Sequence, residues 1–171
     1  MKKLFLFATA LCLASVLNAQ KNPIDELFDK YSEREGFTTI YISSKMFSLF
    51  VDKDAPKDEV ENIMRRLKSI RILTVNDSLL NRDINFYNEL SRKLDFSVYE
   101  ELMVVKEEPV VMKFLIRQDG DVISELLVIS GGPGGNVLIS VKGDLDMKSI
   151  SDLSKSSGIG ELKQLDNIEK K

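Results

Sequence analysis

The chain has 171 residues, of which 43% are hydrophobic, and it carries 24 basic against 27 acidic side chains. It contains no histidine and a single cysteine, Cys12. Mechanisms that use cysteine or histidine as nucleophile, base or metal ligand are therefore excluded once the segment holding Cys12 is removed. The mildly acidic balance argues against a nucleic-acid partner, because binding nucleic acid needs a clustered basic face.

Residues 1–19 have the three-part layout of a secretory signal peptide. Lys2 and Lys3 form a basic start, residues 4–17 are an almost unbroken apolar run, and the small residue Ala19 ends the segment. We therefore expect cleavage after Ala19 and a periplasmic or secreted protein. Because two lysines leave with this segment, the basic side chains fall from 24 to 22 and the net charge moves from −3 to −5.

The remaining residues, 20–171, are expected to form one domain stabilised by packing alone. A lipid anchor on Cys12 is not expected, because Leu11 precedes it where a small residue is normal and apolar residues continue after it. The domain has no other cysteine, so it forms no disulfide. It also has no apolar run long enough for a transmembrane helix.

The first half of this domain alternates predicted helices with two predicted strands. Apolar residues spaced three and four apart predict helices that begin near Pro23 and Val60. The same spacing predicts a single helix over residues 80–94. Runs rich in β-branched residues predict strands over residues 37–43 and 70–75. Ser44 is expected to cap a short apolar helix that reaches Val51.

The second half predicts four strands in succession. The strand-like runs are Tyr99–Lys106, Val110–Gln118, Asp121–Ser130 and Asn136–Lys142. Asp119-Gly120 is a strong hairpin signal, since glycine accepts the positive φ that the turn requires. Direct turns imply an antiparallel four-strand meander. The pattern predicts an α+β fold with a mainly antiparallel sheet, helices packed on one face and a frayed C-terminal end.

Asp144 and Asp146 are the candidates for a metal site. Two carboxylates at this spacing can hold a divalent cation, with phosphate oxygens completing the shell. The simpler interpretation, which we favour, is a turn followed by a last helix for which Asp146 is the N-cap. Leu145 before the cap and Ile150 after it fit a hydrophobic staple.

The densest apolar cluster begins at Met46 and includes Phe47 and Phe50. Packing into the core is the favoured interpretation. A partly exposed contact surface for a protein partner or for lipid is the alternative, and the exposed area of these side chains distinguishes the two.

Other patterns of catalytic sites are weak. Residues 131–135 are glycine-rich, but a strand follows them where a phosphate loop would lead into a helix, so we expect a hairpin link. No serine has lysine three positions later, as a Ser-x-x-Lys enzyme requires. The adjacent glutamates at 100–101 and 107–108 would point to opposite faces of a strand, which is typical of charge that discourages edge pairing.

Several segments together resemble an exported bacterial family known as domain of unknown function forty-two fifty-two. They are Phe28–Tyr31 with Gly36–Thr39, Ile42–Phe47, Ile70–Leu73, Tyr99–Met103, and Gly143–Asp146 up to Ile150. The resemblance implies export, a compact domain and a link with envelope sensing, and it assigns no catalytic residue. Members often carry a lipid-accepting cysteine at the signal cleavage site, from which this sequence departs.

These observations predict an exported, non-enzymatic module that binds an envelope protein or a small ligand and needs no cofactor. The first alternative is a carboxylate-based enzyme with a divalent metal at Asp144 and Asp146. The second is an assembly protein that offers a sheet edge to a partner strand. An uncharged, unpaired edge strand would favour the second alternative.

Overall fold

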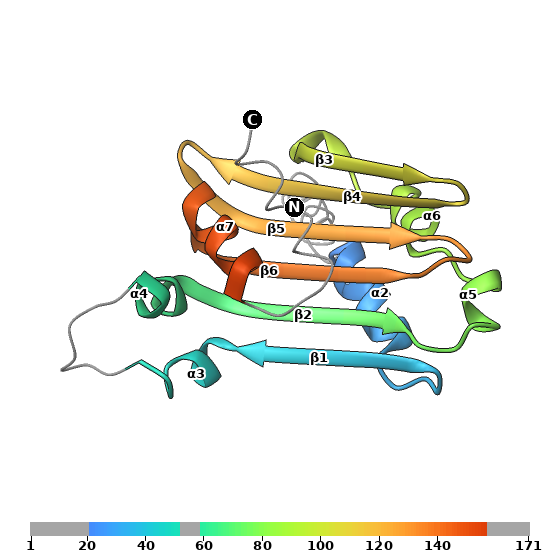
Figure 1. Ribbon diagram of the computed structural model, residues 1–171, viewed down its shortest axis with the longest axis horizontal. Coiled ribbons are helices and arrows are strands. Elements are labelled where there is room, and N and C mark those ends of the chain that lie inside the picture. The colour runs from blue at the N-terminus through green and yellow to red at the C-terminus, as the bar shows by residue number, and fades with distance from the viewer. Residues whose placement is uncertain (1–20, 52–58, 157–171) are drawn as a thin grey trace, which may run out of the picture.

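The computed structural model of the protein describes residues 21–51 and 59–156 (Figure 1). The predicted signal segment with Cys12, and the C-terminal end after Ser156, lie outside the described residues. The elements are α2 (Pro23–Tyr31), β1 (Phe37–Ser43), α3 (Ser44–Phe47), α4 (Glu59–Arg66), β2 (Leu67–Val75), α5 (Leu80–Asp83), α6 (Phe86–Ser91), the 3-10 turn η2 (Phe96–Val98), β3 (Glu100–Glu107), β4 (Val110–Asp119), β5 (Val122–Gly131), β6 (Val137–Leu145) and α7 (Met147–Ser156).

All six strands form one antiparallel sheet in the order β1-β2-β6-β5-β4-β3 (Figure 1). The predicted α+β class and the four-strand meander, β3 to β6, are confirmed. Gly120 makes the β4–β5 turn with φ of +58°, as the Asp119-Gly120 signal predicts. β2 then pairs with β6, which places β1 at one edge of the sheet and β3 at the other.

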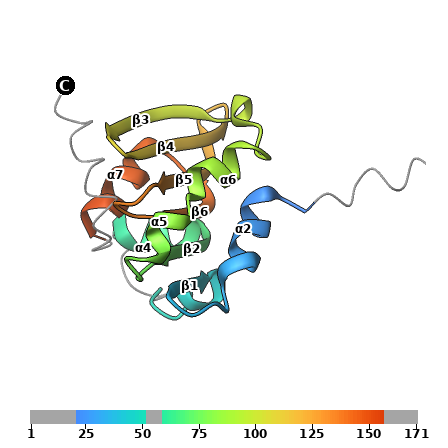
Figure 2. The ribbon, with the colours of Figure 1, turned by 90° about the vertical axis from the view of Figure 1, so that its right-hand side faces the viewer.

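Helices cover both faces of the sheet, so the prediction that they pack on one face is wrong (Figure 2). On one face, which we call the α2 face, α2, α5 and α6 pack over a cluster that includes Leu73, Leu127 and Leu138. On the opposite α7 face, α3, α4 and α7 pack over a second cluster that includes Leu126 and Ile139. The reason is the run of apolar residues along β5 and β6, which supplies apolar side chains to both faces.

The helix predicted over residues 80–94 is instead two short helices, α5 and α6. Ile84 has extended backbone dihedrals, and Asn85 begins α6 by accepting a hydrogen bond from the Asn88 N–H at 2.8 Å. The buried side chain of Asn136 stabilises this break. Its Nδ2 donates to the Ile84 carbonyl at 2.9 Å, and its Oδ1 accepts from the Phe86 N–H at 2.8 Å.

Helix α2 begins as the sequence predicts. Asn22 accepts a hydrogen bond from the N–H of Ile24 at 2.9 Å and so caps α2. Arg71 of β2 pairs with Asp25 and lies 4.0 Å from the centre of the Phe28 ring, which fixes α2 to the sheet. The apolar helix expected to be capped by Ser44 and to reach Val51 differs from the prediction at both ends. α3 runs only from Ser44 to Phe47, and its N-cap position is Ser43, whose side chain makes no capping hydrogen bond.

Candidate functional site

Asp144 and Asp146 lie at the end of β6 and the start of α7, and each is paired with a different cation. Asp144 is exposed and accepts from Lys68 Nζ at 2.6 Å. The Oδ2 atom of Asp146 accepts from Arg66 Nη1 at 2.8 Å. The two carboxylates are thus engaged separately, and no group of three or more acidic side chains that suits a metal ion occurs among the described residues.

Asp146 is the N-cap of α7, as the favoured interpretation of the sequence predicts. Its Oδ1 accepts from the N–H and from the hydroxyl of Ser149, each at 2.7 Å. Leu145 and Ile150 are both buried in the core of the α7 face, as a hydrophobic staple requires. The Arg66 guanidinium, with the two Ser149 donors, holds the pKa of the Asp146 carboxyl well below its ordinary value.

The apolar cluster that begins at Met46 is divided between core and surface. Phe47 is buried in the core of the α7 face. Met46 is 46% exposed, Leu49 76% and Phe50 64%. Core packing therefore accounts for Phe47, whereas Met46 and Phe50 remain candidates for a contact surface.

β1 lies beside this exposed group and is the uncharged edge of the sheet. Its sequence, Phe-Thr-Thr-Ile-Tyr-Ile-Ser, contains no ionisable side chain other than Tyr41. Ile40 and Tyr41 at its centre are 42% and 66% exposed. Among the described residues β1 pairs only with β2, so its second row of backbone N–H and C=O groups has no strand partner.

The opposite edge strand, β3, is charged. Glu100 accepts from Gln118 and Glu101 from Lys113, and Lys106 and Glu107 are exposed. Charged edges resist pairing with another strand. This agrees with the role predicted for the adjacent glutamates and leaves β1 as the edge suited to pairing.

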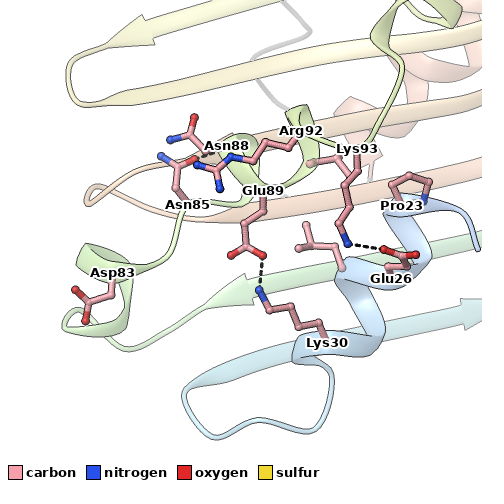
Figure 3. A pocket seen from close by; sticks show the side chains of 11 residues that line it. Pro23, Glu26, Lys30, Asp83, Asn85, Asn88, Glu89, Arg92 and Lys93 are labelled. Carbon is pink, nitrogen blue, oxygen red and sulfur yellow. Dashed lines mark hydrogen bonds and ion pairs between the residues drawn. The ribbon is translucent and has the colours of Figure 1, made fainter.

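A groove of about 640 Å³ runs between α2 and α6 (Figure 3). Lys30 and Glu89 point toward each other across it, as do Lys93 and Glu26, and both pairs are bonded. The Tyr31 hydroxyl also donates to Glu89 at 2.6 Å. Four of the six charged side chains that line the groove are therefore neutralised in pairs, and Asp83 and Arg92 are the other two.

A fully buried carboxylate that no sequence pattern singled out, Glu125, lies on the α2 face of β5. Its two oxygens accept from the Tyr99 hydroxyl at 2.9 Å and the Ser140 hydroxyl at 2.7 Å. Arg117 and Lys142 approach it at 3.3 and 3.8 Å from the strands on either side. A glutamate inside an otherwise apolar strand was the available signal.

The network around Glu125 is closed, because each polar group in it bonds another. Burial, together with the adjacent Glu125 carboxylate, raises the pKa of Tyr99 above its ordinary value. Tyr99 therefore keeps its proton and acts as a donor to Glu125. The arrangement joins the start of β3 to β5 and β6, and its geometry is that of a structural network.

In the described part of the chain, no helix has both the length and the apolar character needed to cross a bilayer. Neither a curated protein nor a solved structure matches the chain. A family does match, over residues 31–153, from the last turn of α2 into α7. This span includes every strand of the sheet. The chain belongs to the family described as a domain of unknown function (DUF4252).

Proposed function

We propose that the protein is an exported, non-enzymatic interaction module that binds a protein partner through the β1 edge. By the β1 edge we mean strand β1 together with the exposed side chains of Met46, Leu49 and Phe50. Export is inferred from the signal-like residues 1–19, and a role in envelope sensing from the family resemblance. The observation that carries the proposal is the uncharged, half-exposed strand at this edge of the sheet.

The physical argument rests on two contributions to binding at a sheet edge. A partner strand that adds to β1 would satisfy its outward N–H and C=O groups, which supplies affinity without sequence-specific contacts. The large exposed side chains Ile40, Tyr41 and Phe50 would supply apolar contact on both faces of the added strand. Aromatic residues of this kind are enriched among those that dominate binding energy.

The metal-enzyme alternative has less support. Asp144 and Asp146, its two ligands, are engaged by Lys68 and by Arg66 with Ser149. The groove between α2 and α6 is the other place for a small ligand, and four of its charged side chains are already paired with one another.

The test is affinity capture from the native envelope followed by mass spectrometry, with wild type and Tyr41→Lys in parallel. We expect an envelope protein to be captured by wild type and lost with Tyr41→Lys. Val122→Lys is the matched control, because Val122 is an exposed strand residue (47%) far from β1 in the sheet order, and it should retain capture. Capture that is indifferent to Tyr41→Lys, or turnover of an ester, glycoside or phosphate substrate by the purified protein, would contradict the proposal.

A further inference from the structure

We propose that the β1 edge binds a second copy of this chain, with the two β1 strands antiparallel and crossing at Ile40. The inference rests on the proposed function, in that it names the partner of the same edge. Pairing would join the two sheets into one continuous antiparallel sheet about a two-fold axis. Three features of β1 support it: the direction of its backbone groups, the distribution of its apolar side chains, and the charges at its two ends.

The backbone of β1 presents alternate residues to the open edge. The N–H of Asn76 donates to the Gly36 carbonyl at 2.8 Å, and the register pairs Thr38 with Thr74. In an antiparallel ladder, even-numbered residues of β1 therefore bond to β2, and odd-numbered ones direct their N–H and C=O outward. With a two-fold axis at Ile40, Thr39 lies opposite Tyr41 of the second copy. Both are outward-directed, so their backbone groups can bond reciprocally.

In this pairing the exposed apolar side chains of the β1 edge contact those of the second copy, so each edge covers the other. Ile40 has the same parity as Ile42, which packs against the core of the α7 face, so Ile40 belongs to that face. On the two-fold axis it contacts Ile40 of the second copy. The antiparallel arrangement also brings α3, with exposed Met46, near the residues that precede β1 in the second copy. An apolar edge is thus covered by an equally apolar one, and no charge is buried.

The charges at the ends of β1 are complementary in this arrangement. Glu35 lies two residues before the strand, and Lys45 two residues after it. Both are exposed, and neither forms an ion pair with another described residue. Antiparallel pairing about Ile40 brings the turn that holds Glu35, just before β1, near the start of α3 in the second copy, which holds Lys45, at both ends of the paired strands. An ion pair at an interface rim contributes to register and orientation more than to affinity.

The register is tested by single-cysteine crosslinking, for which residues 20–171 supply a thiol-free background. At the two-fold axis, the Cα atoms of residue 40 in the two copies lie about 4.5 Å apart, within the range for a disulfide. The corresponding separation for residue 39 or 41 is about 8 Å, which is too long. Under mild oxidation of the processed protein, Ile40→Cys should give a covalent dimer, and Thr39→Cys and Tyr41→Cys should not.

This series contains its own control, because Tyr41 is more exposed than Ile40. Crosslinking by random collision would therefore follow exposure and favour Tyr41→Cys. Dimers that form fastest at residue 39 or 41, or at none of the three positions, overturn the Ile40-centred pairing.

A second measurement needs no crosslink. Sedimentation of the processed protein should show a dimer for wild type. Ile40→Lys, which places two like charges on the axis, should raise the dissociation constant of the dimer by about tenfold or more. Val122→Lys should leave the dimer intact. A wild-type protein that stays monomeric at every soluble concentration overturns this inference. If such a monomer still captures another envelope protein through Tyr41, the proposed function stands, so the two failures are distinguishable.

Discussion

The side-chain oxygen of Asn136 accepts a hydrogen bond from the backbone N–H of Phe86, 50 positions earlier in the chain, at 2.8 Å. The Nδ2 of the same side chain donates to Asn81 Oδ1 and to the Ile84 carbonyl, each at 2.9 Å, and lies 3.2 Å from the Gly132 carbonyl. One buried amide thus joins the α5–α6 break to the β5–β6 loop. An unsatisfied buried polar group is costly, so this residue should matter to stability.

We expect Asn136→Ala to lower the free energy of unfolding by about 2–3 kcal/mol, because it leaves the Phe86 N–H and the Ile84 carbonyl without their partner. Urea denaturation at neutral pH measures the change. The control is Asn88→Ala on the exposed side of α6, which should change stability by about 0.5 kcal/mol or less. Equal effects of the two substitutions would contradict the role given to Asn136.

Tyr99 and Glu125 should be energetically coupled. Tyr99→Phe removes the hydroxyl that donates to the buried carboxylate and should lower the free energy of unfolding by about 1 kcal/mol. Glu125→Met, which is close in size but has no oxygen to accept from Tyr99, leaves Arg117 and Lys142 without their anion and should lower the free energy of unfolding by more. In a double-mutant cycle measured by urea unfolding, the coupling energy should be about 1 kcal/mol. Additive effects would show that the hydrogen bond contributes nothing of its own.

The stability of the protein should depend on the charge of Asp146 in acid. Its pKa in the folded state lies below the unfolded value of 3.8. The carboxylate therefore stabilises the fold above about pH 4, and this contribution is lost as the pH falls toward the folded-state pKa. Asp146→Asn keeps a capping oxygen but loses the charge, so it should be less stable than wild type at pH 7, by an amount that shrinks below pH 4.

Urea unfolding at a series of pH values compares the stability of wild type with that of Asp146→Asn. Asp146→Ala, which also loses the capping oxygen, should lower the free energy of unfolding at pH 7 by about 1 kcal/mol or more. Asp144→Asn is the matched control, since it removes only an exposed ion pair with Lys68 and should change stability by about 0.5 kcal/mol or less. A constant difference between wild type and Asp146→Asn across the acid range would refute the argument.

Gly131 has no room for a side chain. A Cβ there would lie 2.1 Å from Asn85 Oδ1 and 2.7 Å from the backbone nitrogen of Tyr87. We expect Gly131→Ala to destabilise the fold by about 2 kcal/mol or more, because α6 would have to move away from β5. Gly120→Asn is the control. Position 120 faces open space, and its φ of +58° suits asparagine, so the melting temperature of this variant should stay close to that of wild type.

The meander could be predicted from the sequence because its signals are local. Asp119-Gly120 determines one turn, and alternating or β-branched residues mark the strands on either side. The placement of helices on both faces also had a signal that the prediction did not use. Leu126 to Ile129 is a continuous apolar run, which is typical of a strand buried on both faces rather than one.

The break between α5 and α6 could not be predicted in this way. Leu80, Ile84 and Tyr87 have helical spacing, but the bonds that end α5 come from Asn136, a residue distant in sequence. The same limit applies to the candidate site. Asp146 was predicted as a cap from local residues, whereas its partner Arg66 belongs to α4, 80 positions away. The uncharged edge at β1 depends on which strands pair, and the sequence left the strand order open.

The contrast between the two edges of the sheet determines how any assembly would end. Two copies joined at β1 would expose a β3 strand at each outer margin, and those margins carry Glu100, Glu101 and Glu107. Growth of the sheet would therefore terminate at the pair instead of continuing into a fibre. Substitutions that neutralise β3 would remove this stop and convert a closed pair into an open-ended polymer.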